Sequence, residues 1–336
     1  MRALITGASG LAGGWLCHQC VEAGDEVLGV SRRAAVAGGV CEALALDLGD
    51  ASAVTRCIAR FKPDVVYHLA ALSSVARSWV QPAQTLAGNV GGAVNLLSAI
   101  RSDAPEARVI WVSSCEVYGA PAQLPTTEAA PYAPANPYAV SKAAGEMLAA
   151  VYASSHGLRL TCARPYSHSG PRQLPMFLLS NLSRQGAQSR RAGRSELQVV
   201  TGNPDTRRDF TDVRDVARAY RLISALDVTP GSMEIYNVCS GRSISTSEQV
   251  ETLARLLDPI AVDHVVDPAR VRATEVMELR GDHAKLTAAT GWQPGIPLER
   301  TMADMIAWWE RELAGSEPKG AGRQPARSGT PVPPGR

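Results

Sequence analysis

Two residues with the chemistry of a proton-transfer site, Tyr138 and Lys142, stand four positions apart. Residues at this spacing lie on one face of a helix, so the phenol and the ammonium would face the same neighbour. A phenol has an ordinary pKa of about 10, and an adjacent cation lowers it towards the working range of an enzyme. Only four of the 34 basic residues are lysines, which favours a specific role for Lys142. We predict that Tyr138 exchanges a proton with a substrate and that Lys142 sets its acidity.

A second group of reactive side chains, Ser114, Cys115 and Glu116, follows the apolar run 108–112. Ligands of a parallel sheet bind beyond the carboxyl ends of its strands, so we expect these residues beside Tyr138. Ser114 would hydrogen-bond a substrate oxygen. Glu116 would remove a carbon-bound proton that becomes acidic once the neighbouring carbinol is a ketone, or it is a solvated charge. Cys115 would protonate a leaving hydroxyl; the alternative is that it is a small side chain that only packs in the core.

Glycines dominate the turn after the first predicted strand, which reads Thr6-Gly7-Ala8-Ser9-Gly10-Leu11-Ala12-Gly13. Glycines permit a tight turn and let the backbone approach a pyrophosphate, while the helix N-terminus supplies free N–H groups and a partial positive charge. Because the motif lies between a strand and a helix, it is a strong indication of a dinucleotide site. The residues expected to bind the cofactor here are Gly7, Ser9, Gly10, Leu11 and Gly13.

The second predicted strand ends in Arg32 and Arg33, where dinucleotide sites usually offer an acid to the adenosine ribose. Two guanidinium groups favour a ribose 2′-phosphate, which they can bind through paired charged hydrogen bonds. We therefore favour NADP as the cofactor, with NAD as the alternative if the two arginines only belong to a solvated loop. Asp47, at the end of the third strand, either reaches the adenine or caps the next helix.

The scaffold for these groups is visible in the first two-thirds of the chain, where short apolar runs alternate with amphipathic helical stretches. Continuous apolar strands separated by helices are typical of a parallel sheet covered on both faces. The predicted fold class is α/β, a doubly wound parallel sheet (Rossmann) with a smaller α/β substrate-binding lobe. Strands are expected at 3–5, 26–30, 43–46, 64–69, 108–112 and 158–163, and helices at 11–23, 51–61, 84–100 and 137–155.

A change of composition divides the chain after about residue 165. We expect residues 1–165 to form the dinucleotide-binding domain, to which residues 206–238 return as a helix and a strand. Residues 166–205 and 239–313 are expected to form the substrate lobe, which ends in a helix. Residues 314–336 have almost nothing to bury and are expected to be disordered.

The overall composition excludes several classes of protein. The length of 336 residues suggests about two domains, and 45% hydrophobic residues suffice for a sizeable core. The 34 basic and 32 acidic residues nearly cancel, so neither a nucleic-acid partner nor a membrane partner is expected. The sequence contains no transmembrane run and no signal peptide, and its seven scattered cysteines indicate neither a disulfide framework nor a metal site. We expect a cytoplasmic protein.

Over about residues 1–313 the chain resembles the extended short-chain dehydrogenases/reductases, in the group of nucleotide-sugar epimerases and dehydratases. Within this group it is most similar to the branch of GDP-mannose 4,6-dehydratase and GDP-4-keto-6-deoxymannose reductase. The segments that carry the resemblance are TGASGLAG, HLAALSSVARSW, SSCEVYG, NPYAVSK, ARPYSHSGPRQ, RRDFTDVRDVARAY, NVCSG, DPARVRATEV and GDHAKLTAATGW.

The resemblance implies a nucleotide-diphosphate-sugar substrate, with a GDP-hexose favoured, and a homodimer formed through helices near 84–100 and 137–155. It implies that Arg208 and Arg272 bind the pyrophosphate, that Glu275 binds the nucleotide ribose and that His168 orders the loop over the sugar. The chain departs from the branch at Leu72, Cys115 and Ser167. Further positions implied at the substrate are Ser73, Ser114 and Ser167, and those implied at the cofactor are Leu48, Leu69, Ala70, Ala71, Tyr138, Lys142 and Arg164.

The leading functional prediction is an NAD(P)-dependent nucleotide-sugar dehydratase. Tyr138 would deprotonate the C4 hydroxyl as hydride leaves to the cofactor, Glu116 would take the C5 proton, water would leave from C6, and the hydride would return to C6. The alternative is an NADPH-dependent 4-keto-6-deoxy-sugar reductase, in which Tyr138 donates a proton at C4. A 4-epimerase ranks third, and a non-enzymatic nucleotide sensor would be expected to have lost Tyr138 or Lys142.

Overall fold

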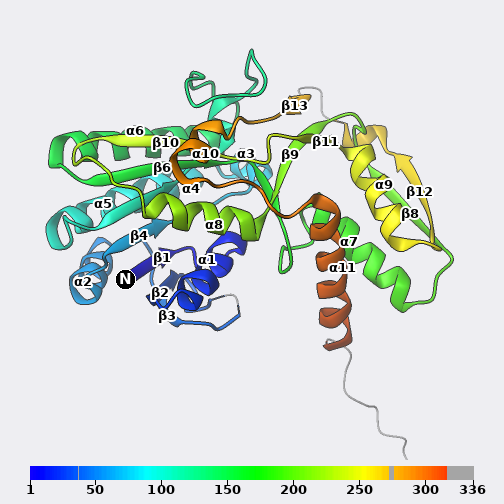
Figure 1. Cartoon of the computed structure of the whole chain (residues 1–336), viewed down its shortest axis with the longest axis horizontal. Coiled ribbons are helices and arrows are strands. Elements are labelled where there is room, and N and C mark those ends of the chain that lie inside the picture. The colour runs from blue at the N-terminus through cyan, green and yellow to red at the C-terminus, as the bar shows by residue number, and fades with distance from the viewer. Residues whose placement is uncertain (37, 272–275, 316–336) are drawn as a thin grey trace, which may run out of the picture.

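The computed structural model describes residues 1–36, 38–271 and 276–315 (Figure 1). The predictions for Arg272 and Glu275 lie outside these residues, as does the tail prediction from residue 316 onward. The first two residues of the expected tail belong to the last helix, α11 (Leu298–Gly315).

A parallel sheet of seven strands forms the centre of the first lobe, in the order β10–β6–β5–β4–β1–β2–β3. The chain winds outward from β1 in one direction and from β4 in the other, which confirms the predicted doubly wound fold. Every pair of neighbouring strands in this sheet runs parallel. The strands are β1 (Arg2–Thr6), β2 (Glu26–Ser31), β3 (Glu42–Ala45), β4 (Val65–His68), β5 (Arg108–Val112), β6 (Arg159–Pro165) and β10 (Met233–Val238).

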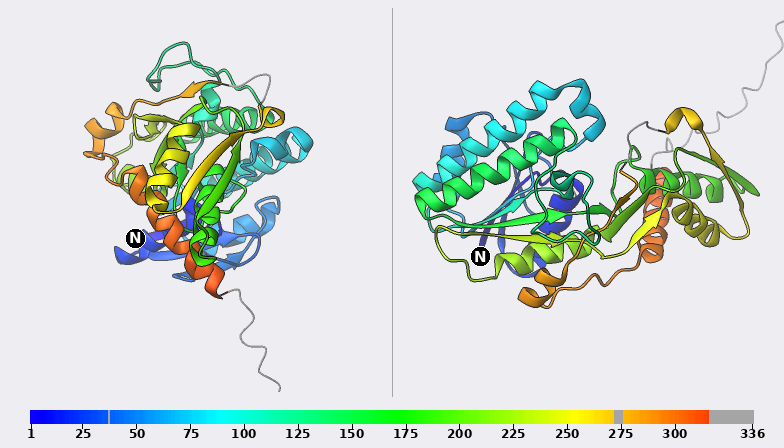
Figure 2. Two further views of the ribbon diagram at one scale, coloured as in Figure 1. Left: turned by 90° about the vertical axis from the view of Figure 1, so that its right-hand side faces the viewer. Right: turned by 90° about the horizontal axis from the view of Figure 1, so that it is seen from above.

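Helices cover both faces of this sheet (Figure 2). Strand β1 shows why, because Ala3 and Ile5 pack into one core cluster and Leu4 into the other. The first cluster lies under α1 (Leu11–Glu22), α8 (Val213–Ser224) and α10 (Ala284–Thr290). The second lies under α2 (Ala51–Phe61), α5 (Gly92–Asp103) and α6 (Pro137–His156). The continuous hydrophobic strands of the sequence therefore reflect burial on both sides.

The region after β4 differs from the single helix expected at 84–100. It divides into α3 (Val75–Val80), α4 (Pro82–Leu86), a π-helical turn (Ala87–Gly91) and α5. Pro82 lacks an N–H group and so begins α4 at its first position. The π-helical turn contains Asn89, whose side chain is buried. Such turns are rare and often occur at functional sites.

In its described part, the second lobe contains two small sheets, three α-helices and a short 3-10 helix (Pro268–Arg270), and it has a separate core (Figure 1). One sheet has the order β11–β9–β13 with β7 beside β9, and the other pairs β12 with β8. The strands are β7 (Ser167–Ser169), β8 (Glu196–Thr201), β9 (Arg207–Asp212), β11 (Ser243–Ser245), β12 (Ala261–Val266) and β13 (Glu278–Leu279). The helices are α7 (Leu178–Arg191), α9 (Thr246–Leu257) and α11.

The chain crosses between the lobes at other places than the predicted boundaries. Strand β9 lies within 206–238 but pairs with strands of the second lobe, so the return to the first lobe begins with α8. Conversely, α10 and Trp292 were expected in the substrate lobe and pack into the core of the first lobe. The indole Nε1 of Trp292 donates to the carbonyl oxygen of Asp215 at 3.0 Å, which fixes this crossing.

Three further features bear on the expected class of protein. None of the helices in the described ranges is long and apolar enough to span a membrane. All seven cysteines are free thiols, and Cys17 and Cys20 are buried in α1. Among the described residues, no group of three or more His, Cys, Asp or Glu side chains is arranged to hold a metal ion.

Candidate active site

The N-terminus of α6 presents Tyr138 and Lys142 at the carboxyl end of the sheet. Asn136 caps the helix, since its Oδ1 accepts from the backbone N–H of Ala139 at 2.8 Å. Lys142 lies one turn after Tyr138, and its Nζ donates to the carbonyl oxygen of Val112, the last residue of β5, at 2.7 Å. Tyr138 and Lys142 are both buried. The predicted pair therefore lies against the end of β5.

The segment after β5 brings Ser114 and Glu116 to the same place. Ser114 caps a short helical turn by accepting from the Glu116 N–H at 3.2 Å. Ser114 lies close enough to Tyr138 for its hydroxyl to lower the pKa of the phenol, against the larger effect of burial. The Glu116 carboxylate accepts from Nδ2 of the cap residue Asn136 at 2.9 Å. Ser114, Glu116, Tyr138 and Lys142 are thus brought together as the sequence predicts.

Burial dominates the protonation of the two central groups. It raises the pKa of Tyr138 above the ordinary value of a phenol, and the hydroxyl of Ser114 opposes this only in part. The predicted lowering by Lys142 and an oxidised nicotinamide concerns the complex with the cofactor and stays a prediction, while in the protein alone desolvation sets the direction. Burial lowers the pKa of Lys142 to about 8, although Cys162 and Glu146 act in the opposite direction. At neutral pH the phenol is neutral and the lysine is mainly an ammonium.

Cys115 has surroundings that do not suit an acid. Its side chain is buried, and burial raises the pKa of the thiol well above the usual range. Burial raises the pKa of Tyr138 in the same direction, so the feature that separates Cys115 from Tyr138 is its packing in a cluster of buried side chains. This placement corrects the expected role of Cys115 and fits the alternative of a small side chain that only packs in the core. The cluster around it consists of Val117, Tyr118, Ala143, Tyr166 and Cys239.

The turn between β1 and α1 has the close packing expected of a dinucleotide cradle. Gly7 has a φ of +75°, and a Cβ there would lie 2.9 Å from the backbone nitrogen of Ala70. Gly10 begins α1 without a side-chain cap. Side chains cap α2, α6, α8 and α9 instead. Within the described structure the first N–H groups of α1, those of Leu11 to Gly13, thus suit a bound pyrophosphate, with Ser9 in the turn before them.

Two segments that follow β2 and β3 complete the expected cofactor side. Arg32 and Arg33 are exposed directly after β2. Asp47 accepts from the backbone N–H of Gly49 at 2.8 Å. The helix-capping alternative for Asp47 is wrong, because Asp50 caps α2. Leu48 packs against α5, because a Cβ added to Gly92 would lie only 3.0 Å from the Cβ of Leu48.

Hydrogen bonds to Thr6, the last residue of β1, fix the residues that follow β4. The N–H groups of Leu69 and Ala70 donate to the carbonyl oxygen of Thr6 at 3.3 Å and to its hydroxyl at 3.2 Å. Leu69 and Ala70 therefore lie against the glycine turn, and the cofactor contacts predicted for them and for Ala71 stay predictions. Ser73 is exposed. Its predicted contact with substrate stays a prediction.

Asn89 is a site residue that the sequence reasoning missed. From the π-helical turn, its Oδ1 accepts from the backbone N–H of Leu72 at 2.7 Å. Its Nδ2 donates to Oγ of Ser141 at 2.8 Å, between Tyr138 and Lys142 on α6. A polar residue on the buried face of an otherwise apolar helix is the signal that could have found it.

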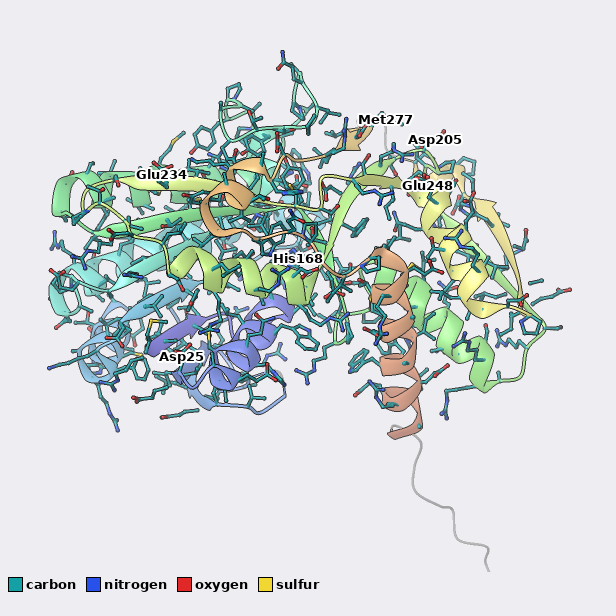
Figure 3. All side chains as sticks on the ribbon, in the orientation of Figure 1. Asp25, His168, Asp205, Glu234, Glu248 and Met277 are labelled. Atoms are coloured by element: carbon teal, nitrogen blue, oxygen red, sulfur yellow. The ribbon has the colours of Figure 1, made fainter. Side chains whose placement is uncertain are left out.

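The residues expected at the substrate lie where the two lobes meet. Ser167 and His168 form part of β7, and Figure 3 places His168 at the junction of the lobes. Burial lowers the pKa of His168, whose Nδ1 is hydrogen-bonded to the carbonyl oxygen of Tyr166 at 3.1 Å. Arg208 lies on β9, and its predicted contact with the substrate stays a prediction.

Arg164 has a different role from the one expected. Its side chain is only 2% exposed and forms an ion pair with Glu146, with Nη2 and Oε2 2.6 Å apart. Its guanidinium carbon lies 4.8 and 4.9 Å from the ring centres of Tyr118 and Tyr132. The expected contact of this side chain with the cofactor is therefore corrected, because the guanidinium group is already held inside the protein.

Known proteins resemble this chain over most of its length. The family model for GDP-mannose 4,6 dehydratase matches residues 4–305. The GDP-6-deoxy-D-mannose reductase of Pseudomonas aeruginosa is 38% identical over 75% of this chain and 82% of its own length. The GDP-mannose 4,6-dehydratase of Yersinia enterocolitica is 27% identical over 91% and 93%.

Solved structures agree with this assignment. RMD from Pseudomonas aeruginosa, complexed with NADPH, has a TM-score of 0.80 and 31% identity, covering 93% of this chain and 100% of its own. The UDP-glucose 4-epimerase of Thermus thermophilus, in complex with NAD, has a TM-score of 0.80 and 26% identity, covering 92% and 99%. The site geometry and these matches together show that the chain belongs to the GDP-mannose 4,6-dehydratase family, within the extended short-chain dehydrogenases/reductases.

Proposed function

We propose that the protein is an NADP-dependent enzyme that reduces the 4-keto group of a nucleotide-linked 6-deoxy sugar, with a GDP-linked sugar favoured. The observation that carries this proposal is the contrast between Tyr138 and Cys115. The groups that a carbonyl reduction needs, Ser114, Tyr138 and Lys142, are gathered and buried at one strand end. The additional proton donor that an elimination needs would have to be Cys115, whose side chain is instead packed in a buried cluster with Val117 and Cys239.

The chain's own residues supply the proton and its electrostatic support. Ser114 hydrogen-bonds the carbonyl oxygen at C4 and orients it towards Tyr138. Tyr138 is protonated at neutral pH and donates its proton to this oxygen as negative charge develops. Lys142, anchored on Val112, stabilises the phenolate that results. The glycine turn would hold NADPH, which would supply the hydride to C4 when bound.

The preference for NADP over NAD rests on Arg32 and Arg33. Both follow β2 and are exposed, so they are available for a phosphate on the adenosine ribose. The P. aeruginosa RMD, which is similar to this chain, was solved with NADPH. The charge, position and accessibility of these two arginines therefore support a 2′-phosphate site.

A nucleotide-sugar 4,6-dehydratase is the second candidate, and Glu116 favours it. Asn136 holds this carboxylate beside Ser114, where a base for the C5 proton would be needed. With Cys115 buried, Glu116 would have to take the C5 proton and return it to the leaving C6 hydroxyl. The same carboxylate would act as base and then as acid, which is chemically possible because both steps lie on neighbouring carbons.

Product analysis separates the two reactions. The purified chain is incubated with GDP- and UDP-linked hexoses and with their 4-keto-6-deoxy derivatives, with and without NADPH, and C4 and C6 are followed by NMR. A reductase consumes one NADPH for each keto sugar reduced at C4. Formation of a 4-keto-6-deoxy product from a hexose without consumption of coenzyme would contradict the reductase proposal and favour the dehydratase.

The Glu116→Gln variant tests the same choice from the protein side. A reductase keeps most of its turnover, because Tyr138 still supplies the proton, whereas a dehydratase loses at least about 100-fold with its base. Glu106→Gln is the matched control, since Glu106 is an exposed partner of Arg159 far from the site. Loss of reductase turnover in Glu116→Gln but not in Glu106→Gln would show that the carboxylate takes part in the reduction.

We also propose that the partner of this chain is a second copy. Val140, Met147 and Val151 are exposed along α6, and Val94 is exposed on the neighbouring α5. The spacing of seven and four residues places the three α6 side chains in one stripe. Such a stripe on two adjacent helices suits a helix-to-helix interface between identical subunits.

We also propose that the enzyme acts in the cytoplasm. Its seven cysteines are free thiols, which a reducing compartment would maintain.

A further inference from the structure

A buried ion pair lies directly behind the catalytic residues and is not used by the proton transfer itself. Glu146 is fully buried, and Arg164 is 2% exposed. Arg164 Nε lies 3.1 Å from both carboxylate oxygens of Glu146, and Nη2 lies 2.6 Å from Oε2. Buried ion pairs are weak stabilisers, because desolvation of both charges offsets their attraction. Their presence next to a site therefore calls for a further reason.

The Glu146 carboxylate joins four parts of the site. It belongs to α6, and its ion-pair partner Arg164 belongs to β6. It also accepts hydrogen bonds from the hydroxyl of Ser113, which directly follows β5, and from the hydroxyl of Tyr132 at 2.8 Å. Tyr132 lies in the loop that leads to α6. Four donor groups thus saturate one carboxylate and fix these segments to each other.

Glu146 and Lys142 clamp two consecutive residues of the chain. Lys142 Nζ donates to the carbonyl oxygen of Val112, and Glu146 accepts from the hydroxyl of Ser113. The next residue is Ser114, and Tyr138 lies one turn before Lys142 on the same helix. The two clamps therefore fix the register of α6 against the end of β5. This register determines how the hydroxyls of Ser114 and Tyr138 face each other.

We propose that Glu146, paired with Arg164, is a positioning residue for the proton transfer: its carboxylate clamps Ser113 next to the Val112 carbonyl that anchors Lys142, so that Ser114 and Tyr138 stay in register. The inference rests on the redox step at Tyr138 that the proposed reductase and the dehydratase share. It therefore does not depend on which of the two reactions the enzyme performs.

The charges around Lys142 make the role measurable. On its own helix Lys142 faces Glu146, which raises its pKa, and on β6 it faces Cys162. On β4 it faces His68, whose pKa burial lowers to about 3, so His68 is neutral in the working range. Arg164 is the nearby cation that Glu146 balances. Removing the Glu146 charge would leave Arg164 as an unpaired buried cation, which disfavours the charged form of Lys142.

The main experiment uses Glu146→Gln and a direct titration of Lys142. Only four lysines are present, so 13C-lysine labelling gives few signals, and a Lys142→Met variant assigns the one of interest. We expect the pKa of Lys142 to fall from about 8 by about one unit. The alkaline limb of the pH–rate profile should move by the same amount. We expect kcat to fall about tenfold or more, with KM for the nucleotide sugar within about twofold.

Two further variants keep the test decisive. Tyr132→Phe removes one hydrogen bond from the carboxylate but keeps its charge, so the Lys142 titration should not move. Glu146→Gln with Arg164→Gln removes both charges and replaces the single variant if that variant does not fold. In this double variant the Lys142 titration should return towards the wild-type value, while kcat stays low because the clamp on Ser113 is weakened.

The outcomes separate the inference from the proposed function. A wild-type protein that reduces none of the keto sugars contradicts the proposed reductase, while the NMR titration still tests Glu146. An unshifted Lys142 titration together with a wild-type kcat in Glu146→Gln overturns the inference. A wild-type kcat in the double variant overturns it as well. Equal changes of kcat and KM, without a shift of the pH profile, would indicate a merely structural pair.

Discussion

The catalytic end of β5 and the cofactor segment after β2 are built in opposite ways. At β5 the polar groups are buried and bonded before any ligand arrives: Lys142 to Val112, Glu146 to Ser113 and Arg164. After β2, Arg32 and Arg33 are exposed. The groups that perform chemistry need a fixed geometry, whereas groups that select a phosphate can remain solvated until it binds.

The difference has an energetic cause. A polar group buried without a partner costs about 1–3 kcal/mol, so most buried polar groups near Tyr138 have a bonded neighbour, the exceptions including Arg164 Nη1 and the Tyr220 hydroxyl. This requirement accounts for Asn89, whose side chain bonds Leu72 and Ser141. An exposed arginine carries no such cost. Substitutions at the β5 end should therefore affect catalysis and folding together, and substitutions after β2 should affect only the binding of the cofactor.

The largest effect is expected from Tyr138→Phe, which tests the buried region. Loss of the proton donor should reduce kcat by about 100-fold or more. The affinity for NADPH, measured by fluorescence, should stay within about threefold of wild type, because Tyr138 contributes its hydroxyl to chemistry rather than to phosphate binding. A matched control is Tyr152→Phe, since Tyr152 lies on α6 and bonds Ser98 away from the site. Substantial turnover in Tyr138→Phe would show that another group supplies the proton.

A smaller effect is expected from Arg32→Ala combined with Arg33→Ala, which tests the exposed region. Loss of two charge-assisted contacts should weaken NADPH binding by about 10- to 100-fold and leave NADH binding nearly unchanged. The melting temperature should not change, because both side chains are exposed. Arg56→Ala on the exposed face of α2 serves as the control. Equal weakening of both coenzymes would place the two arginines outside the 2′-phosphate site.

The smallest effect on turnover is expected on the outer face of α6, which carries the buried catalytic groups on its inner face. Met147→Glu with Val151→Glu should convert a dimer to a monomer in sedimentation analysis, because buried carboxylates without partners oppose association. Turnover should change less than about threefold, since these side chains point away from the site. Thr55→Glu, at an exposed position of α2, is the control. An unchanged sedimentation coefficient would exclude this face as the interface.

Much of the first lobe could be predicted because its signals are local. The glycine turn between β1 and α1, the strand ending at Val112 and the helix with Tyr138 and Lys142 all follow from short sequence patterns. The helix at 84–100 was only partly predictable. Pro82 signals a new helix start, but the π-helical turn at Asn89 arises from contacts with residue 72, which no local pattern contains.

The sequence alone therefore determines the layered α/β fold and the residue types at the ends of its strands, because hydrophobic periodicity and turn chemistry act over a few residues. The tertiary structure decides which of those side chains are free for chemistry. Only in the folded chain does Cys115 become buried, Arg164 meet Glu146 and β9 join the second lobe. These outcomes depend on long-range packing and desolvation, which are properties of the assembled core and not of any segment.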